Sequence, residues 1–202
     1  TAQVRFTEIA MGTPLLTEIV ACNGVDVPVR LTLPAASTAF PAAIALAPAN
    51  DARWRDVCTA SDRIVGITDT EVHWGAALAF TFATTSVKSL AETLDLNVAI
   101  RPLGTLNVGV GKERSLWLGQ FKGGVESGAF AWRLVKWVDG PAAPNALTTD
   151  SKGNWFWITK QGRVVMMDES YRISYPGDGV WPITRLQVSP LYSVYATCHA
   201  VY

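Results

Sequence analysis

Apolar residues alternate with other residues in almost every periodic segment of this chain, and a period of two is the pattern of β-strands. The alternation is clearest over residues 29–33, 76–82, 93–100, 115–121, 129–137 and 193–202. Turn sequences rich in glycine, proline, asparagine and aspartate lie between these segments, for example at 103–113 and 139–145. Many short strands separated by such turns are typical of a β-sandwich or a β-barrel.

Two short helices are predicted within this mostly β chain. Residues 50–63 read NDARWRDVCTASDR, and Trp54, Val57 and Cys58 follow one another at helical spacing after a capping asparagine or aspartate. A second helix is predicted over 86–94. The sequence shows no apparent internal repeat and no linker long enough to divide it, so residues 1–202 are predicted to form a single domain.

The composition predicts that part of the apolar surface faces a partner. Hydrophobic residues make up 49% of the chain and charged residues only 17%, and eight residues are tryptophan. Soluble domains usually carry about 25% charged residues. One small core does not readily bury this much apolar surface, so a protein–protein contact is expected.

Charge and cysteine usage exclude several classes of protein. The most basic segment, 101–163, has 9 Lys/Arg against 4 Asp/Glu, without the dense basic run of a nucleic-acid-binding arm. No apolar run approaches the 18 or so residues of a membrane span, and no signal peptide is apparent. Cys22, Cys58 and Cys198 are few and widely spaced, so they are predicted to be reduced and to bind no metal.

Catalytic motifs are not apparent. His73 and His199 both lie in predicted strands, and Cys198 cannot pair with His199 because adjacent strand residues point to opposite faces. The glycines of 103–111 lack the spacing of a phosphate-binding loop. The chain is therefore predicted to be no enzyme and to bind no cofactor, although a β-sandwich glycosidase with carboxylates from separate strands remains an alternative.

Tryptophans give the strongest signal, and several of them lie in predicted strands that are apolar on both faces. In GNWFWITKQG, residues 153–162, Trp155 and Trp157 share one side of the strand while Phe156 and Ile158 share the other. Such a strand is buried on both faces, packs against another chain, or presents its tryptophans to a sugar. The candidates for core or subunit interface are Trp117, Trp132, Trp137, Trp155 and Trp157.

The order of features from 50 to 82, with the loop that precedes them, resembles a known family. A Pro/Ala-rich loop leads into the predicted helix at RWRDVC, and a strand with the pattern of Trp74, Gly75, Leu78, Phe80 and Phe82 follows. This is similar to the jelly-roll coat proteins of small icosahedral positive-strand RNA viruses, most of all the plant picorna-like group. The resemblance implies an eight-stranded jelly-roll β-sandwich with one or two short helices, forming a single domain over residues 1–202.

The function implied by this resemblance is structural. The chain would be a subunit of an icosahedral shell, made in the host cytoplasm and found in the virion, with other capsid subunits as its partners. Any contact with genomic RNA is expected to be weak, because a basic arm is absent, and no contact with a membrane is expected. The alternative is a carbohydrate-binding, lectin-like β-sandwich that uses tryptophan platforms.

Overall fold

The computed structural model describes residues 3–11, 16–32, 43–104, 106–123, 128–150, 152–168 and 170–176. These residues form β-strands and a few short 3₁₀ helices. The strands lie in four antiparallel sheets of four strands each. The prediction of a mostly β chain is confirmed, whereas an eight-stranded jelly roll is not.

The four sheets, called blades 1 to 4, follow one another along the chain. Blade 1 comprises β1 (Arg5–Met11), β2 (Leu16–Cys22), β3 (Val29–Thr32) and β4 (Ile44–Ala45). Blade 2 comprises β5 (Asp56–Ala60), β6 (Arg63–Ile67), β7 (Glu71–Trp74) and β8 (Val87–Ser89). Blade 3 comprises β9 (Asn97–Leu103), β10 (Asn107–Lys112), β11 (Ser115–Phe121) and β12 (Phe130–Trp137). Blade 4 comprises β13 (Leu147–Thr149), β14 (Trp155–Ile158), β15 (Val164–Met167) and β16 (Ile173–Ser174).

Each blade is a meander in which strands that are consecutive in sequence pair with one another. A jelly roll is built from Greek keys, and these require a strand to pair with one far away in the sequence. None of the strand pairs in the described ranges does so. The period-two pattern therefore identified several strands but carried no information about their partners.

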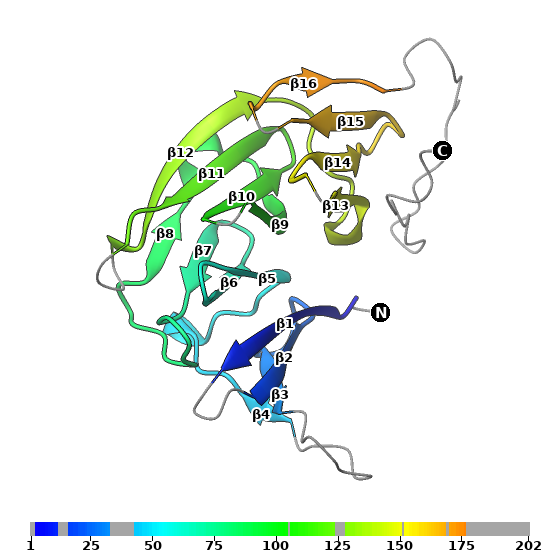
Figure 1. Ribbon diagram of the computed structural model, residues 1–202. Helices are drawn as coiled ribbons and strands as arrows, with labels where there is room; N and C mark the ends of the chain where they lie inside the picture. Colours follow the sequence, from blue (N-terminus) through cyan, green and yellow to red (C-terminus); the bar gives the residue numbers. More distant parts are fainter. Residues whose placement is uncertain are drawn as a thin grey trace.

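The blades are arranged along an arc with their first strands on the inside (Figure 1). Strand β5 contacts both β1 and β9, and β9 contacts β13. Successive four-stranded meanders packed in this radial way are the blades of a β-propeller. The inner strands begin at Arg5, Asp56, Asn97 and Leu147, so the repeat is 51, 41 and 50 residues long, although none is apparent in the sequence.

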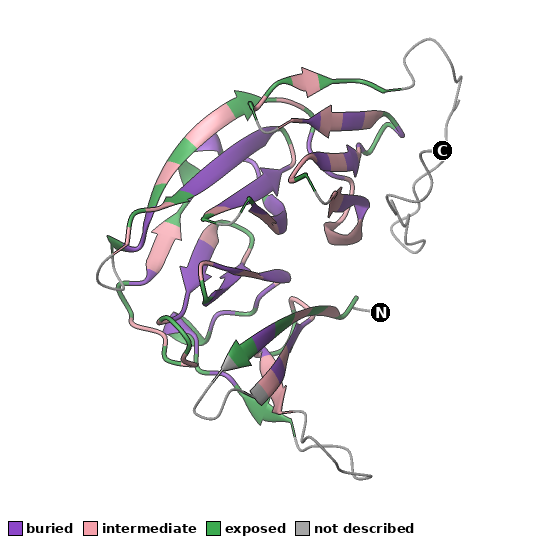
Figure 2. Ribbon diagram, viewed as in Figure 1, coloured by how far each residue is buried: buried purple, intermediate pink, exposed green. Residues whose placement is uncertain are grey.

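Three hydrophobic cores hold the arc together, one between each pair of neighbouring blades. Val20 of blade 1 packs with Val57 and Ile64 of blade 2. Blade 2 meets blade 3 through a core that contains Val65 and Ile100, among others. The third core joins blade 3 to the tryptophans of β14. Blades 2 and 3 therefore bury both of their faces, as the purple strands in the middle of Figure 2 show.

The helix predicted over 50–63 is wrong. A short 3₁₀ helix, η1 (Ala49–Asp51), is followed by β5 and β6. Val57 and Cys58 are adjacent in β5 and enter two different cores, one on each face of the blade. Burial on both faces makes consecutive strand residues apolar, and together with the buried Trp54 of the preceding loop this produced a helical spacing by coincidence.

Two other predictions fail around blade 2. Residues 76–82 form no strand but a connection in which Leu78 has a positive φ, while Phe80 and Phe82 pack against the core around Trp54. The helix predicted over 86–94 is replaced by β8 and the short 3₁₀ helix η2 (Ala91–Thr93). The strand predicted over 193–202 lies outside the described residues.

Gly109 in β10 allows blade 4 to approach blade 3. A Cβ atom at this position would overlap ring atoms of Trp155, whose indole N–H donates to the Pro102 carbonyl over 3.2 Å. The absence of a side chain therefore provides the space for this tryptophan.

Replacing Gly109 by alanine is expected to destabilise the protein by about 1–3 kcal/mol, because overpacking forces a rigid, hydrogen-bonded ring to move. Chemical denaturation measures the change. Gly128→Ala is the matched control, since a Cβ there meets nothing within 4 Å and its φ is not positive. Equal stability of the two variants would contradict the close packing at Gly109.

Candidate functional site

Three charged side chains meet where the inner strands of blades 1, 2 and 3 lie side by side. Arg5 comes from β1, Asp56 from β5 and Arg101 from β9. They form one ionic cluster, called here the axial cluster. These strands lie on the inside of the arc (Figure 1), and the cluster joins the three of them.

Asp56 is the centre of the axial cluster and is fully buried. Its Oδ1 accepts a hydrogen bond from Arg5 Nε at 3.1 Å. Its Oδ2 accepts from Arg101 Nη1 and from the backbone N–H of Ile100, the latter at 3.0 Å. A buried carboxylate requires such partners to offset its lost hydration, and both of its oxygens are therefore occupied.

The two arginines differ in how much of their hydrogen-bonding capacity the protein uses. Arg101 also donates to the carbonyls of Ile100 and Pro144, which fixes its guanidinium. Arg5 uses Nε on Asp56, and its two terminal nitrogens have no partner among the described residues. The Arg5 side chain is 21% exposed. A guanidinium held at Nε with its terminal fork uncommitted can bind a carboxylate or phosphate in a bidentate way.

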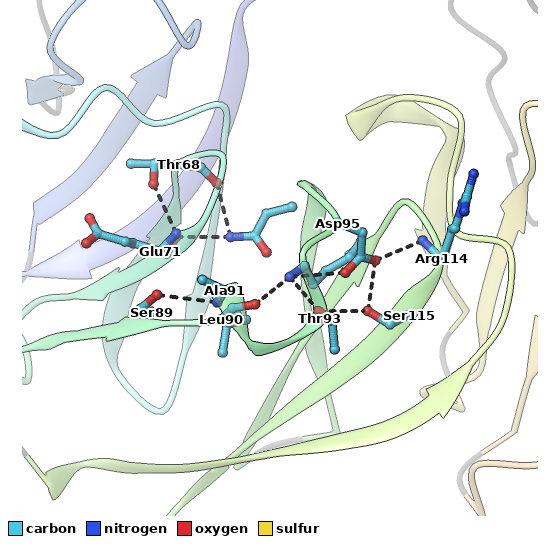
Figure 3. Close-up of polar contacts among 11 residues, drawn as sticks. Thr68, Glu71, Ser89, Leu90, Ala91, Thr93, Asp95, Arg114 and Ser115 are labelled. Atoms are coloured by element: carbon cyan, nitrogen blue, oxygen red, sulfur yellow. Dashed lines mark hydrogen bonds and ion pairs between the residues drawn. The ribbon is translucent and has the colours of Figure 1, made fainter.

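A second polar network joins blades 2 and 3 but is closed to ligands. Fully buried Lys112 donates to the Leu90 carbonyl and to Thr93 Oγ1, and its Nζ lies 3.3 Å from Asp95 Oδ1. Figure 3 shows Asp95 also accepting from the backbone N–H of Arg114 and from Ser115.

Desolvation alone would raise the pKa of Asp95. The hydrogen bonds it accepts, helped by the Lys112 charge, outweigh that effect and lower its pKa. A network with these internal partners serves structure.

His73 is in a strand, as predicted, and is buried in blade 2 next to Trp54. Burial lowers the pKa of His73, and the nearby Glu71 carboxylate, 3.2 Å from Nε2, opposes this shift. Burial also disfavours the charged form of the Cys22 and Cys58 thiols. It raises the pKa of both, so neither is an activated nucleophile. His199 and Cys198 lie outside the described residues.

The five tryptophans singled out from the sequence do not form one site. Trp155 and Trp157 are 1% and 0% exposed in the core between blades 3 and 4. Trp117 is buried between blades 2 and 3, Trp132 packs against the same core, and Trp137 is exposed at the end of β12. The lectin-like alternative is wrong for Trp155 and Trp157, because a sugar platform requires rings that face solvent.

One pocket outside the axial cluster could be mistaken for a site. A pocket of about 160 Å³ is lined by turn residues of blades 3 and 4, among them Glu113 and Lys160. The side chains of these two residues form an ion pair at 2.7 Å and so satisfy each other's charge.

Within the described ranges, no group of three or more His, Cys, Asp or Glu residues is placed to hold a metal ion. No helix among those residues is long and apolar enough to cross a membrane.

Sequence reasoning missed the axial cluster completely. Asp56 was assigned to a helix, and Arg5 and Arg101 received no role. One signal was available: Asp56 is a charged residue directly before the apolar pair Val57 and Cys58. A charge in a strand that is buried on both faces needs a partner, but the partners lie 51 residues before it and 45 after it.

No protein-family model matches the chain, and no curated protein matches it significantly. Among solved structures, one from Bacteroides uniformis, described as "a putative 6-phosphogluconolactonase", is similar with a TM-score of 0.55 and 12% sequence identity. The match covers 87% of this chain and 54% of that chain. This chain therefore spans about half the length of the structure it matches, and at this identity the likeness concerns the fold.

This likeness contradicts two predictions from the sequence, those of a virus-shell subunit and of a chain without enzymatic activity. The fold is shared with a protein described as an enzyme. The strand on which the coat-protein resemblance depended, residues 76–82, does not form. The apolar richness that suggested a shell has another cause, because each inner blade of the arc is buried on two faces.

Proposed function

We propose that the arc forms part of a β-propeller that binds an anionic small molecule at the axial cluster. The observation that carries the proposal is the Arg5 guanidinium, which is anchored through Nε to Asp56 and has no described partner for its terminal nitrogens. Two arginines against one aspartate leave the cluster with one net positive charge. A phosphate or carboxylate would supply the missing negative charge and accept two parallel hydrogen bonds.

The class of ligand is supported by the similar solved structure. A 6-phosphogluconolactonase acts on a phosphorylated sugar lactone, so its substrate carries a phosphate. We propose the same class, a phosphorylated sugar acid or its lactone, for this chain. In lactone hydrolysis, water adds to the ring carbonyl, the ring C–O bond breaks, and the products are the hydroxy acid carboxylate and a proton.

Titration calorimetry with inorganic phosphate, 6-phosphogluconate and gluconate tests the binding site. We expect both phosphate-containing ligands to bind and gluconate to bind more weakly. Arg5→Gln is expected to weaken phosphate binding by about 10- to 100-fold, because a charge-assisted hydrogen bond contributes about 1.5–3 kcal/mol. Release of acid from 6-phosphogluconolactone tests the hydrolytic step separately.

Lys136→Gln is the matched control, because it removes the same charge from an exposed position on β12, the outer strand of blade 3. Its affinity for phosphate is expected to equal that of the unaltered protein. Equal affinities for Arg5→Gln and Lys136→Gln, or an absence of phosphate binding at millimolar concentration, would rule out the axial cluster as the site.

A further inference from the structure

The two ends of the arc each present an apolar sheet face that packs on no described blade. On blade 1, the strand register places on one face, away from blade 2, the apolar side chains of Phe6, Ile19, Ala21, Val29 and Leu31, together with the one carboxylate of Glu8 opposite Ile19. On blade 4, the face away from blade 3 carries Phe156, Ile158, Val164 and Met166. These sets are called the blade 1 end face and the blade 4 end face.

The end faces are of the same kind as the faces already packed inside the arc. Blade 3 receives Trp155, Trp157 and Val165 of the following blade on a surface that contains Leu116 and Leu118. The blade 4 end face is the corresponding surface one blade further on, with β-branched, aromatic and thioether side chains. The blade 1 end face corresponds to the side by which each blade packs on the one before it. One end therefore complements the other.

Phe6, on the blade 1 end face, is more exposed than is usual for an aromatic residue in an inner strand. Phe6 lies in the inner strand β1 and is 61% exposed, although the inner strands β5 and β9 are buried between neighbours. Together with the half-buried Ile19, Val29 and Leu31, Phe6 forms an apolar patch on the sheet, and such patches mark protein–protein contacts. The similar solved structure has nearly as much chain again outside the matched part, so about one further arc is needed to complete a fold of that length.

We propose that a second copy of this chain supplies that arc, with the blade 4 end face of each copy packed on the blade 1 end face of the other. Such a head-to-tail contact closes into a ring when the rotation returns to the start. Two arcs of four blades give eight, within the range of four to eight seen in propellers. The channel is then lined by two axial clusters, one from each copy, and a single arc forms only part of its wall.

Light scattering coupled to size exclusion tests the assembly. We expect a dimer, at twice the 21.8 kDa of one chain, across the micromolar range. Phe6→Glu replaces the exposed aromatic ring by a second carboxylate beside Glu8 in both junctions of the dimer, and this variant is expected to give monomers. Trp137→Glu is the matched control: Trp137 is 60% exposed but lies on β12, on neither end face, so this variant is expected to stay dimeric. Circular dichroism checks that each variant is folded.

Mixing two variants distinguishes this arrangement from other dimers. Met166→Glu alters the blade 4 end face and is also expected to give monomers. A mixture of Phe6→Glu and Met166→Glu is expected to recover dimers, because a mixed pair has one junction with both changes and one junction with neither. A dimer formed by like faces would lose its contact through one of the two variants alone, and mixing would not restore it.

The remaining outcomes overturn the proposal. An unaltered protein that is monomeric at 100 µM means that the end faces are covered by the chain itself or by another protein. A ladder of sizes that grows with concentration means that the head-to-tail contact does not close. Since none of these measurements involves a ligand, failure of the ring leaves the Arg5 binding experiment unaffected.

Discussion

Replacing Trp155 and Trp157 together by alanine is expected to detach blade 4 from blade 3. Both rings are buried in one core, and their N–H groups donate to the carbonyls of Pro102 and Asp139. Truncating a buried tryptophan costs about 3–5 kcal/mol, so the pair costs as much as a typical domain's whole stability of about 5–15 kcal/mol. We expect a partly unfolded protein.

Hydrogen exchange shows where the damage lies. In an array of repeats, stability comes from each repeat and its contacts with neighbours. Protection is therefore expected to disappear first from β13 to β15 and to persist in β5 and β6. Trp137→Ala is the control, since its exposed ring is expected to contribute less than 1 kcal/mol. A double variant with an unchanged melting temperature would show that these tryptophans do not hold the blade in place.

Several strands were predictable because their residues alternate visibly. Residues 29–32, 115–121 and 130–137 are strands as predicted, and β14 has its tryptophans on one face as GNWFWITKQG indicated. Period two follows from the geometry of a single strand. The arrangement of the strands into blades could not be read in this way, because pairing depends on turns and on neighbouring sheets.

Two failures of the sequence interpretation share one physical origin, which is burial on two faces. In blade 2 the residues of β5 point alternately into two cores, so Val57 and Cys58 are both apolar and the alternation disappears. The same double burial explains the low charge content, which was taken as evidence for a shell. The axial cluster was hidden for a different reason: its three members come from different blades and are joined by no local motif.

Replacing Asp56 by asparagine is expected to destabilise the protein by about 3 kcal/mol. The change leaves Arg5 and Arg101 close together without a counter-charge. The remaining amide offers one acceptor oxygen where two oxygens now accept three hydrogen bonds. Breaking a buried ion pair costs about 3–5 kcal/mol, and the lower value is expected because both guanidinium groups keep some contact with water. Urea denaturation measures the effect.

Asp69→Asn is the matched control for the Asp56 variant. Its carboxylate binds Arg55 at 2.7 Å, but this pair is exposed, and an exposed pair contributes about 0.2–1 kcal/mol. If the two variants lose equal stability, the axial cluster is not a buried ion network.

A further variant separates stability from binding: changing Arg5, Asp56 and Arg101 together to methionine, leucine and methionine removes every charge without leaving one unpaired. Such replacements are often neutral for stability, so this protein should fold but no longer bind phosphate if the arginines are there for a ligand.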